Sequence, residues 1–151
     1  MSVNLFGIKT VLLAKHAQHV VLIPFEVAVF TVAVAFNYCA HCANNRPLAA
    51  AVYFNLLLTA VFTVPVVATG LIAWQLALEG QKLEGILLMH LVLGCITSVL
   101  IWLVFWIHLR VRRHPEESLP KYRLPLEAIA VLLMGLPGHL YGFLSGVNGP
   151  G

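Results

Sequence analysis

Residues 86–108 read ILLMHLVLGCITSVLIWLVFWIH, an apolar run that contains no Asp, Glu, Lys or Arg. An α-helix needs about 20 such residues to cross the ~30 Å hydrocarbon core of a lipid bilayer. A helix that is apolar on every side has no face to present to water, so lipid is the solvent that suits it. The run therefore predicts a helix that spans a membrane.

Three more apolar stretches flank this run. We expect four membrane-spanning helices, at about residues 18–37, 48–78, 85–109 and 123–145. The second is longer than one crossing needs, which predicts a tilt, a kink at Pro65 or an extension beyond the bilayer. The four helices use most of the 151 residues, so we expect residues 1–151 to form a single membrane domain. The predicted fold is all-α, an integral membrane four-helix transmembrane bundle.

The composition agrees with a membrane location. Hydrophobic residues make up 60% of the chain, charged residues only 10%, and there is no Asp, whereas average proteins are about a quarter charged. The basic residues lie in short loops rather than along one face, which argues against nucleic-acid binding. The chain leaves no room for a separate catalytic domain, so we expect a subunit that contacts lipid and other membrane subunits rather than a stand-alone enzyme.

The basic residues predict the orientation of the bundle. The densest cluster follows the third span and comprises Arg110, Arg112, Arg113, Lys121 and Arg123. Short cytoplasmic loops accumulate Lys and Arg, so this loop should face the cytoplasm. We expect a multi-pass protein of a bacterial inner membrane with both termini outside. Lys9 and Lys15 oppose this orientation but are fewer.

Histidines inside the spans are the main candidates for a functional site, because ionisable groups in a bilayer are costly. His90 in the third span and His139 in the fourth fall at a similar depth, roughly 8–10 Å below the outer boundary at 1.5 Å of rise per residue. His19 begins the first span on the same side. Two imidazoles from different helices of a bundle can hold the iron of a haem b.

Small residues occur at the same depth, namely Gly70, Gly94 and Gly138. They let helices approach closely or let a flat cofactor lie against the backbone. We therefore expect one haem b held by two of the three histidines at this depth, His19, His90 and His139. The other interpretation is that these histidines only form hydrogen bonds between helices.

The remaining histidines form no convincing second pair. His108 should lie at the cytoplasmic interface, and His41 and His114 should lie in loops. Cys39 and Cys42 flank His41, but the histidine that follows the second cysteine in a haem c attachment sequence is missing. A metal site there would need a further ligand.

Glu26 is a further ionisable residue that is costly to place inside a bilayer. It follows His19 by seven residues on the same helix face and lies near the middle of the first span. A carboxyl group at that depth should be neutral unless it is paired. Two interpretations are open. Glu26 takes up a proton beside a redox or quinone site, or it hydrogen-bonds a neighbouring helix without a further role.

Three segments resemble the bacterial membrane-protein family known as domain of unknown function 2231. They are HVVLIPF at residues 19–25, ATGLIAW at residues 68–74, and the early histidine of the third span, His90. The resemblance covers roughly residues 16–145 and implies a four-helix membrane fold with a haem-linked redox role, often beside cytochromes. Pro24 stands where that family usually has a second histidine, and His139 stands where it tends to have glycine. The resemblance thus implies His90 and His139 as the expected ligand pair, with His19 as the alternative partner of His90.

These interpretations combine into one functional hypothesis. The chain would be a membrane cytochrome b-type subunit with one haem b near the outer face. It would transfer electrons between the quinone pool and a partner redox protein within a larger complex, and Glu26 would handle a proton. The alternative is a cofactor-free structural or anchoring subunit of a membrane redox complex.

Overall fold

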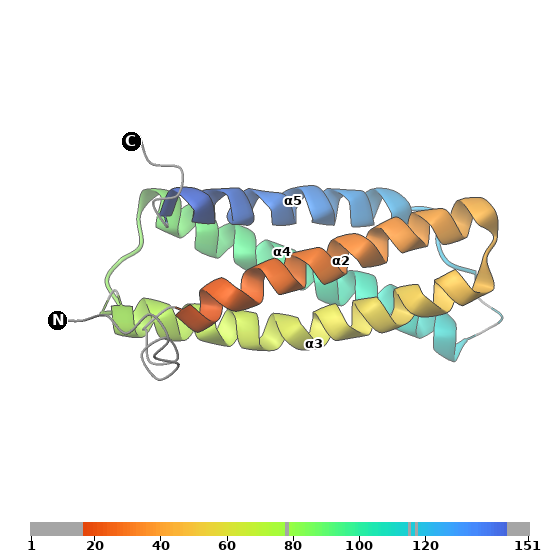
Figure 1. The fold of residues 1–151 in the computed structure, drawn as a ribbon, viewed down its shortest axis with the longest axis horizontal. Coiled ribbons are helices and arrows are strands. Elements are labelled where there is room, and N and C mark those ends of the chain that lie inside the picture. The colour runs from red at the N-terminus through yellow and green to blue at the C-terminus, as the bar shows by residue number, and fades with distance from the viewer. Residues whose placement is uncertain (1–16, 78, 115, 117, 145–151) are drawn as a thin grey trace, which may run out of the picture.

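The structure is a computed structural model that describes residues 17–77, 79–114, 116 and 118–144. These residues form four helices: α2 (Ala17–Ala43), α3 (Arg46–Ala77), α4 (Gly85–Arg113) and α5 (Arg123–Leu144). The helices lie side by side and alternate in direction (Figure 1). Each packs against two neighbours, in the cyclic order α2, α3, α4, α5. Among the described residues the fold is therefore all-α, as predicted.

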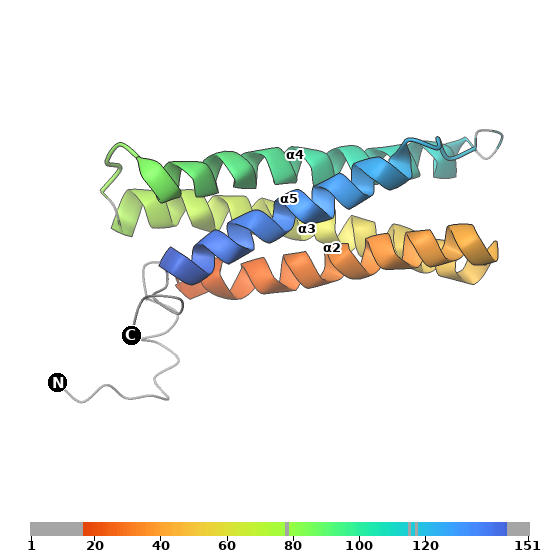
Figure 2. The same ribbon diagram turned by 90° about the horizontal axis from the view of Figure 1, so that it is seen from above.

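The two ends of the bundle differ in character. We call the end where α2 and α4 begin and α3 and α5 finish the histidine end, because it carries His19 and His90. At the opposite end lie Arg110, Arg112 and Arg113, the last residues of α4, and we call this the basic end. Figure 2 shows α5 crossing the other helices obliquely between the two ends.

Three of the helices are long and apolar enough to cross a membrane. The qualifying segments are His19–Ala43, Pro47–Gln75 and Gly85–Arg113. Large apolar side chains cover their outer faces; Val21 and Val99, for example, are each 67% exposed. An apolar surface of this extent is unfavourable in water and suits lipid, so the chain is a membrane protein.

The first helix is longer than expected and ends at Ala43 rather than near residue 37. Nothing in residues 38–43 stops a helix, and Asn44 ends it by adopting a left-handed φ of 48°. Cys39, His41 and Cys42 therefore lie in the last turns of α2, with exposed side chains, and not in a loop.

The turn into α3 follows from the next residues. The Asn45 side-chain oxygen accepts a hydrogen bond from the backbone N–H of Leu48 at 3.0 Å, which caps the new helix. Pro47 lies in the first turn, where its missing N–H costs nothing.

The centre of the bundle is an apolar layer to which all four helices contribute. Its buried members are Phe30, Ala33, Val52, Leu56, Ala60, Ile101, Val104, Phe105, Ala130 and Met134. The three alanines come from three different helices and let those helices approach closely. Buried polar side chains lie on either side of this layer, and they position the candidate sites.

Candidate functional site

The imidazole of His19 is held against α3 at the histidine end. Its Nδ1 lies 3.0 Å from the backbone carbonyl oxygen of Val66 and 3.3 Å from the hydroxyl oxygen of Thr69. A carbonyl oxygen can only accept, so Nδ1 carries the proton and donates it. In the neutral ring this leaves the lone pair on Nε2, and the tautomer and the ring orientation are both set by α3.

Gly70 makes this placement possible. A Cβ built on Gly70 would lie 2.9 Å from Cε1 of His19 and 3.3 Å from each ring nitrogen. Contacts this short do not occur between carbon atoms, so the His19 ring lies directly against backbone that bears no side chain. Gly70 is the small residue that the packing of α2 on α3 requires here.

His90 approaches the same place from α4, across the bundle from α2. The centres of the His19 and His90 rings are 6.2 Å apart, and their planes are nearly perpendicular at 87°. The His90 side chain is half-buried. The structure therefore brings together the two histidines of the alternative pair.

The other predicted members of this site lie differently. The side chain of His139, near the end of α5, is exposed. A Cβ on Gly94 would meet no atom within 4 Å, so Gly94 is not at a tight helix contact. The surroundings of Gly138 fall outside the described residues. The preference for His139 over His19 stays a prediction.

Replacing Gly70 by alanine should displace the His19 ring. We expect the ring to lose its hydrogen bond to the Val66 carbonyl, which costs about 1 kcal/mol. Alanine in a helix interior stabilises by a similar amount relative to glycine, so the free energy of unfolding should change little.

Gly94→Ala is the matched control, because it gains the same helix propensity without a clash. Its free energy of unfolding, measured by denaturation in mixed detergent micelles, should exceed that of Gly70→Ala by about 1 kcal/mol. Equal free energies for the two variants would contradict the close contact between Gly70 and His19.

Glu26 lies deeper in the same seam between α2 and α3. Its side chain is 6% exposed, and its Oε1 is 2.5 Å from the hydroxyl oxygen of Thr63. The Thr63 hydroxyl also lies 2.9 Å from the backbone carbonyl oxygen of Thr59. As placed, the Thr63 hydroxyl donates to both acceptors and shares its one proton between them. If Glu26 is protonated, its own proton can go to Thr63 and each acceptor then has a donor. The contacts therefore suit the neutral acid.

A groove of about 570 Å³ runs between α3 and α4 beside this pair. Thr63 lines it, so the groove is one side chain away from Glu26. Most of its other lining is apolar and faces outward: Val64, Val67, Ala68, Leu71, Val99 and Trp102, with Ser98 as a second hydroxyl. The groove is thus open to the lipid phase.

A third polar cluster lies toward the basic end and joins three helices. Asn37 of α2 donates its side-chain amide to both carboxylate oxygens of Glu127, at 2.8 Å and 2.6 Å. His108 of α4 contacts the same carboxylate through Nε2 at 3.0 Å. All three are buried, and Glu127 is only 1% exposed. The cluster ties α5 to α2 and to α4.

Sequence-based prediction missed this cluster. Glu127 is the single carboxylate in the expected span 123–145 and could have been found by the rule that drew attention to Glu26. His108, expected at the interface, is buried because Glu127 faces it. Arg123 lies one turn before Glu127, and its Nε is buried without a hydrogen-bond partner.

The cysteines add no metal centre within the described ranges. Cys39, Cys42 and Cys95 are free thiols with exposed side chains. No cluster of three or more His, Cys, Asp or Glu side chains among these residues is arranged to hold a metal ion.

The sequence matches the model of a known protein family. The model of the family described as "Predicted membrane protein (DUF2231)" matches residues 15–147. No curated protein matches the chain, and no solved structure does.

Proposed function

This chain belongs to the DUF2231 family of membrane proteins, and from its paired histidines we propose that it is a cytochrome b-type subunit with one haem b between His19 and His90. The separation of the two rings carries the proposal. Imidazole nitrogens bind first-row metal ions at about 2 Å, so two imidazoles on opposite sides of one ion have ring centres roughly 6–6.5 Å apart. The observed 6.2 Å falls within that range.

The surroundings of His19 support a ligand role. Histidines that bind metals usually donate their other N–H to a carbonyl or carboxylate, which fixes the tautomer and makes the ligand nitrogen more basic. The Nδ1 contact with the Val66 carbonyl does this for Nε2 of His19. Gly70 adds backbone without a side chain beside the ring. The residues present therefore fit a bis-histidine haem.

Haem iron exchanges single electrons, and its potential depends on the axial ligands, their hydrogen bonds and burial. In this chain α3 would orient one ligand through Val66 and Thr69, while α4 would supply the other. The apolar faces of the helices would exclude water. We propose that the chain transfers electrons between the quinone pool and a partner redox subunit of a larger complex.

The groove between α3 and α4 is the place we assign to a quinone. It opens to the lipid phase in which quinones dissolve, and Trp102 offers a flat aromatic face. Thr63 connects it to the carboxyl group of Glu26, so Glu26 would take up or release the proton that accompanies the electron.

The proposal also includes α5 as a fourth span. Its 22 residues extend about 33 Å at 1.5 Å per residue, which is enough to cross the hydrocarbon core. Leu132 is 72% exposed, as a side chain that faces lipid would be. With four spans and the basic end in the cytoplasm of a bacterial inner membrane, both termini would lie outside.

The test is the absorption spectrum of the purified full-length protein. We expect a b-type reduced-minus-oxidised difference spectrum and, by pyridine haemochrome assay, about one haem b per chain, the number that one histidine pair can ligate. Circular dichroism should confirm that the same sample is helical.

A colourless, helical protein that also fails to take up added haemin would contradict the haem proposal. It would favour the alternative, a cofactor-free structural or anchoring subunit. The Asn37–Glu127–His108 cluster suits that alternative, because it links three helices without any cofactor.

A further inference from the structure

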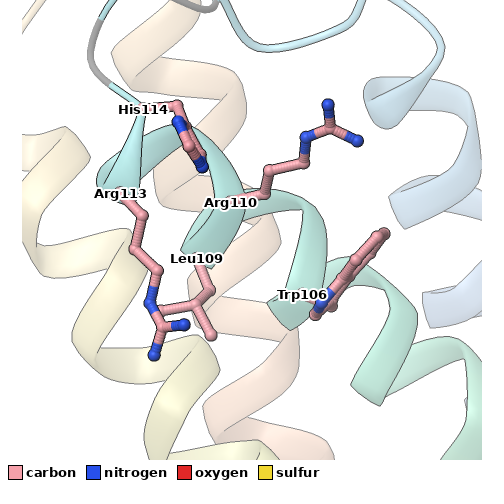
Figure 3. A pocket seen from close by; sticks show the side chains of 5 residues that line it. All are labelled: Trp106, Leu109, Arg110, Arg113 and His114. Atoms are coloured by element: carbon pink, nitrogen blue, oxygen red, sulfur yellow. The ribbon is translucent and has the colours of Figure 1, made fainter.

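We propose that the end of α4 binds the phosphate headgroup of an anionic phospholipid. A pocket of about 330 Å³ lies there, lined by Trp106, Leu109, Arg110, Arg113 and His114 (Figure 3). Trp106, Leu109, Arg110 and Arg113 follow one another at helical spacing, so they occupy one face of the last turns of α4, and His114 is the residue that follows the helix. Figure 3 shows the Arg110 and Arg113 side chains extending to different sides of the helix end, with the His114 ring between them.

The pocket has the polarity profile of a lipid molecule. Trp106 and Leu109 form its apolar part, one to two turns nearer the middle of the helix than Arg113 and His114. A lipid has the same order, with acyl chains toward the bilayer centre and phosphate at the surface. Trp106 is 56% exposed, and tryptophan is enriched at the boundary between these two regions.

The depth of the pocket fits the headgroup layer. Helix α4 has 29 residues and so extends about 43 Å, while the hydrocarbon core is about 30 Å thick. At least one end of α4 must therefore reach the polar layer. The last turns of α4 at the basic end carry three arginines, and burying them in hydrocarbon would be costly.

The charged side chains at the end of α4 differ in the contacts that they make. Arg112 lies outside the pocket, because its guanidinium carbon is 4.1 Å from the centre of the Tyr53 ring and 5.6 Å from that of Phe54. Arg113 lines the pocket, and none of the ion pairs between described residues includes it. His114 contacts the Glu116 carboxylate at 3.1 Å, an interaction at the exposed rim. Arg113 is thus the side chain with most to gain from a phosphate.

The experiment measures which lipid lies next to Trp106. Full-length protein with Trp74→Phe and Trp102→Phe retains Trp106 as its single tryptophan. It is reconstituted in phosphatidylcholine vesicles that contain increasing amounts of brominated phosphatidylglycerol, or of brominated phosphatidylcholine with the same acyl chains. Bromine quenches tryptophan fluorescence on contact, so the quenching curve reports the relative occupancy of the pocket.

We expect phosphatidylglycerol to be favoured over phosphatidylcholine, and Arg113→Gln to lower that preference about fivefold, the effect of one basic residue at a lipid surface. Arg112→Gln is the matched control, since it removes the same charge from the next position, and should change the preference less than about twofold. Glu116→Gln removes the competing anion and should raise the preference.

Two outcomes would overturn the proposal. Equal quenching by the two brominated lipids would show that the pocket does not select a negative headgroup. If Arg112→Gln and Arg113→Gln lowered the preference for phosphatidylglycerol equally, only the general charge of the basic end would attract the lipid. Both variants alter exposed side chains, so neither outcome can be attributed to misfolding.

Discussion

His90→Ala is expected to abolish haem binding, and His19→Ala is expected to do the same. Each substitution removes one of the two imidazoles whose ring centres lie 6.2 Å apart. Loss of a residue that merely orients a ligand typically costs 10–100-fold in metal affinity, so loss of the ligand itself should cost about 100-fold or more. The measurement is the haem content after purification, followed by titration of the apoprotein with haemin.

His139→Ala is the matched control, because it removes an imidazole at the same end of the bundle whose side chain is exposed. It should retain about one haem per chain. Added imidazole should restore a six-coordinate spectrum to His90→Ala if the vacated ligand position is open. A colourless His139→Ala together with a coloured His19→Ala would instead establish the pair favoured by sequence, His90 and His139.

Glu127→Ala is expected to cause the largest loss of stability of any single substitution in the chain. Asn37 and His108 would both lose a buried acceptor within the bundle. Removing one partner of a buried pair costs about 3–5 kcal/mol in soluble proteins, while hydrogen bonds between membrane helices contribute roughly 0.6–1.7 kcal/mol each. Because the substitution removes the acceptor of all these hydrogen bonds, we expect the free energy of unfolding to fall by about 2–5 kcal/mol.

The free energy of unfolding in mixed micelles, with helicity as the readout, measures this loss. Glu127→Gln should cost less, because its amide oxygen still accepts a hydrogen bond from Asn37. Glu116→Ala is the control carboxylate: it is exposed, so its substitution should stay within about 0.5 kcal/mol. A change equally small for Glu127→Ala would show that the cluster does not hold α5 to the bundle.

Hydropathy alone predicted the helical part of this fold well. The expected spans 85–109 and 123–145 nearly coincide with α4 and with α5. The end of α2 was placed too early because residues 38–43 are more polar than the span before them. The polarity of a residue does not stop a helix; the left-handed Asn44 does.

The candidate site was harder to predict, because depth in a bilayer can be read from a sequence but helix rotation cannot. His19, His90 and His139 all fall at one depth, and only the packing of α2 on Gly70 aims the His19 ring toward α4. The same reason explains why the contacts of Glu127 could not be predicted from the sequence. Its position within a span is evident from the sequence, but its partners Asn37 and His108 are 90 and 19 residues away.

The apolar layer at the middle of the bundle has an electrical consequence. Residues 27–36 of α2, 99–107 of α4 and 128–138 of α5 contain no Asp, Glu, Lys, Arg or His. This stretch of α2 separates Glu26 from Asn37 by about 16 Å along the helix axis. A membrane voltage therefore falls mainly across this layer, where moving one elementary charge costs about 2.3 kcal/mol per 100 mV. Glu26, His19 and His90 therefore lie on one side of this voltage drop, and Glu127 and His108 lie on the other.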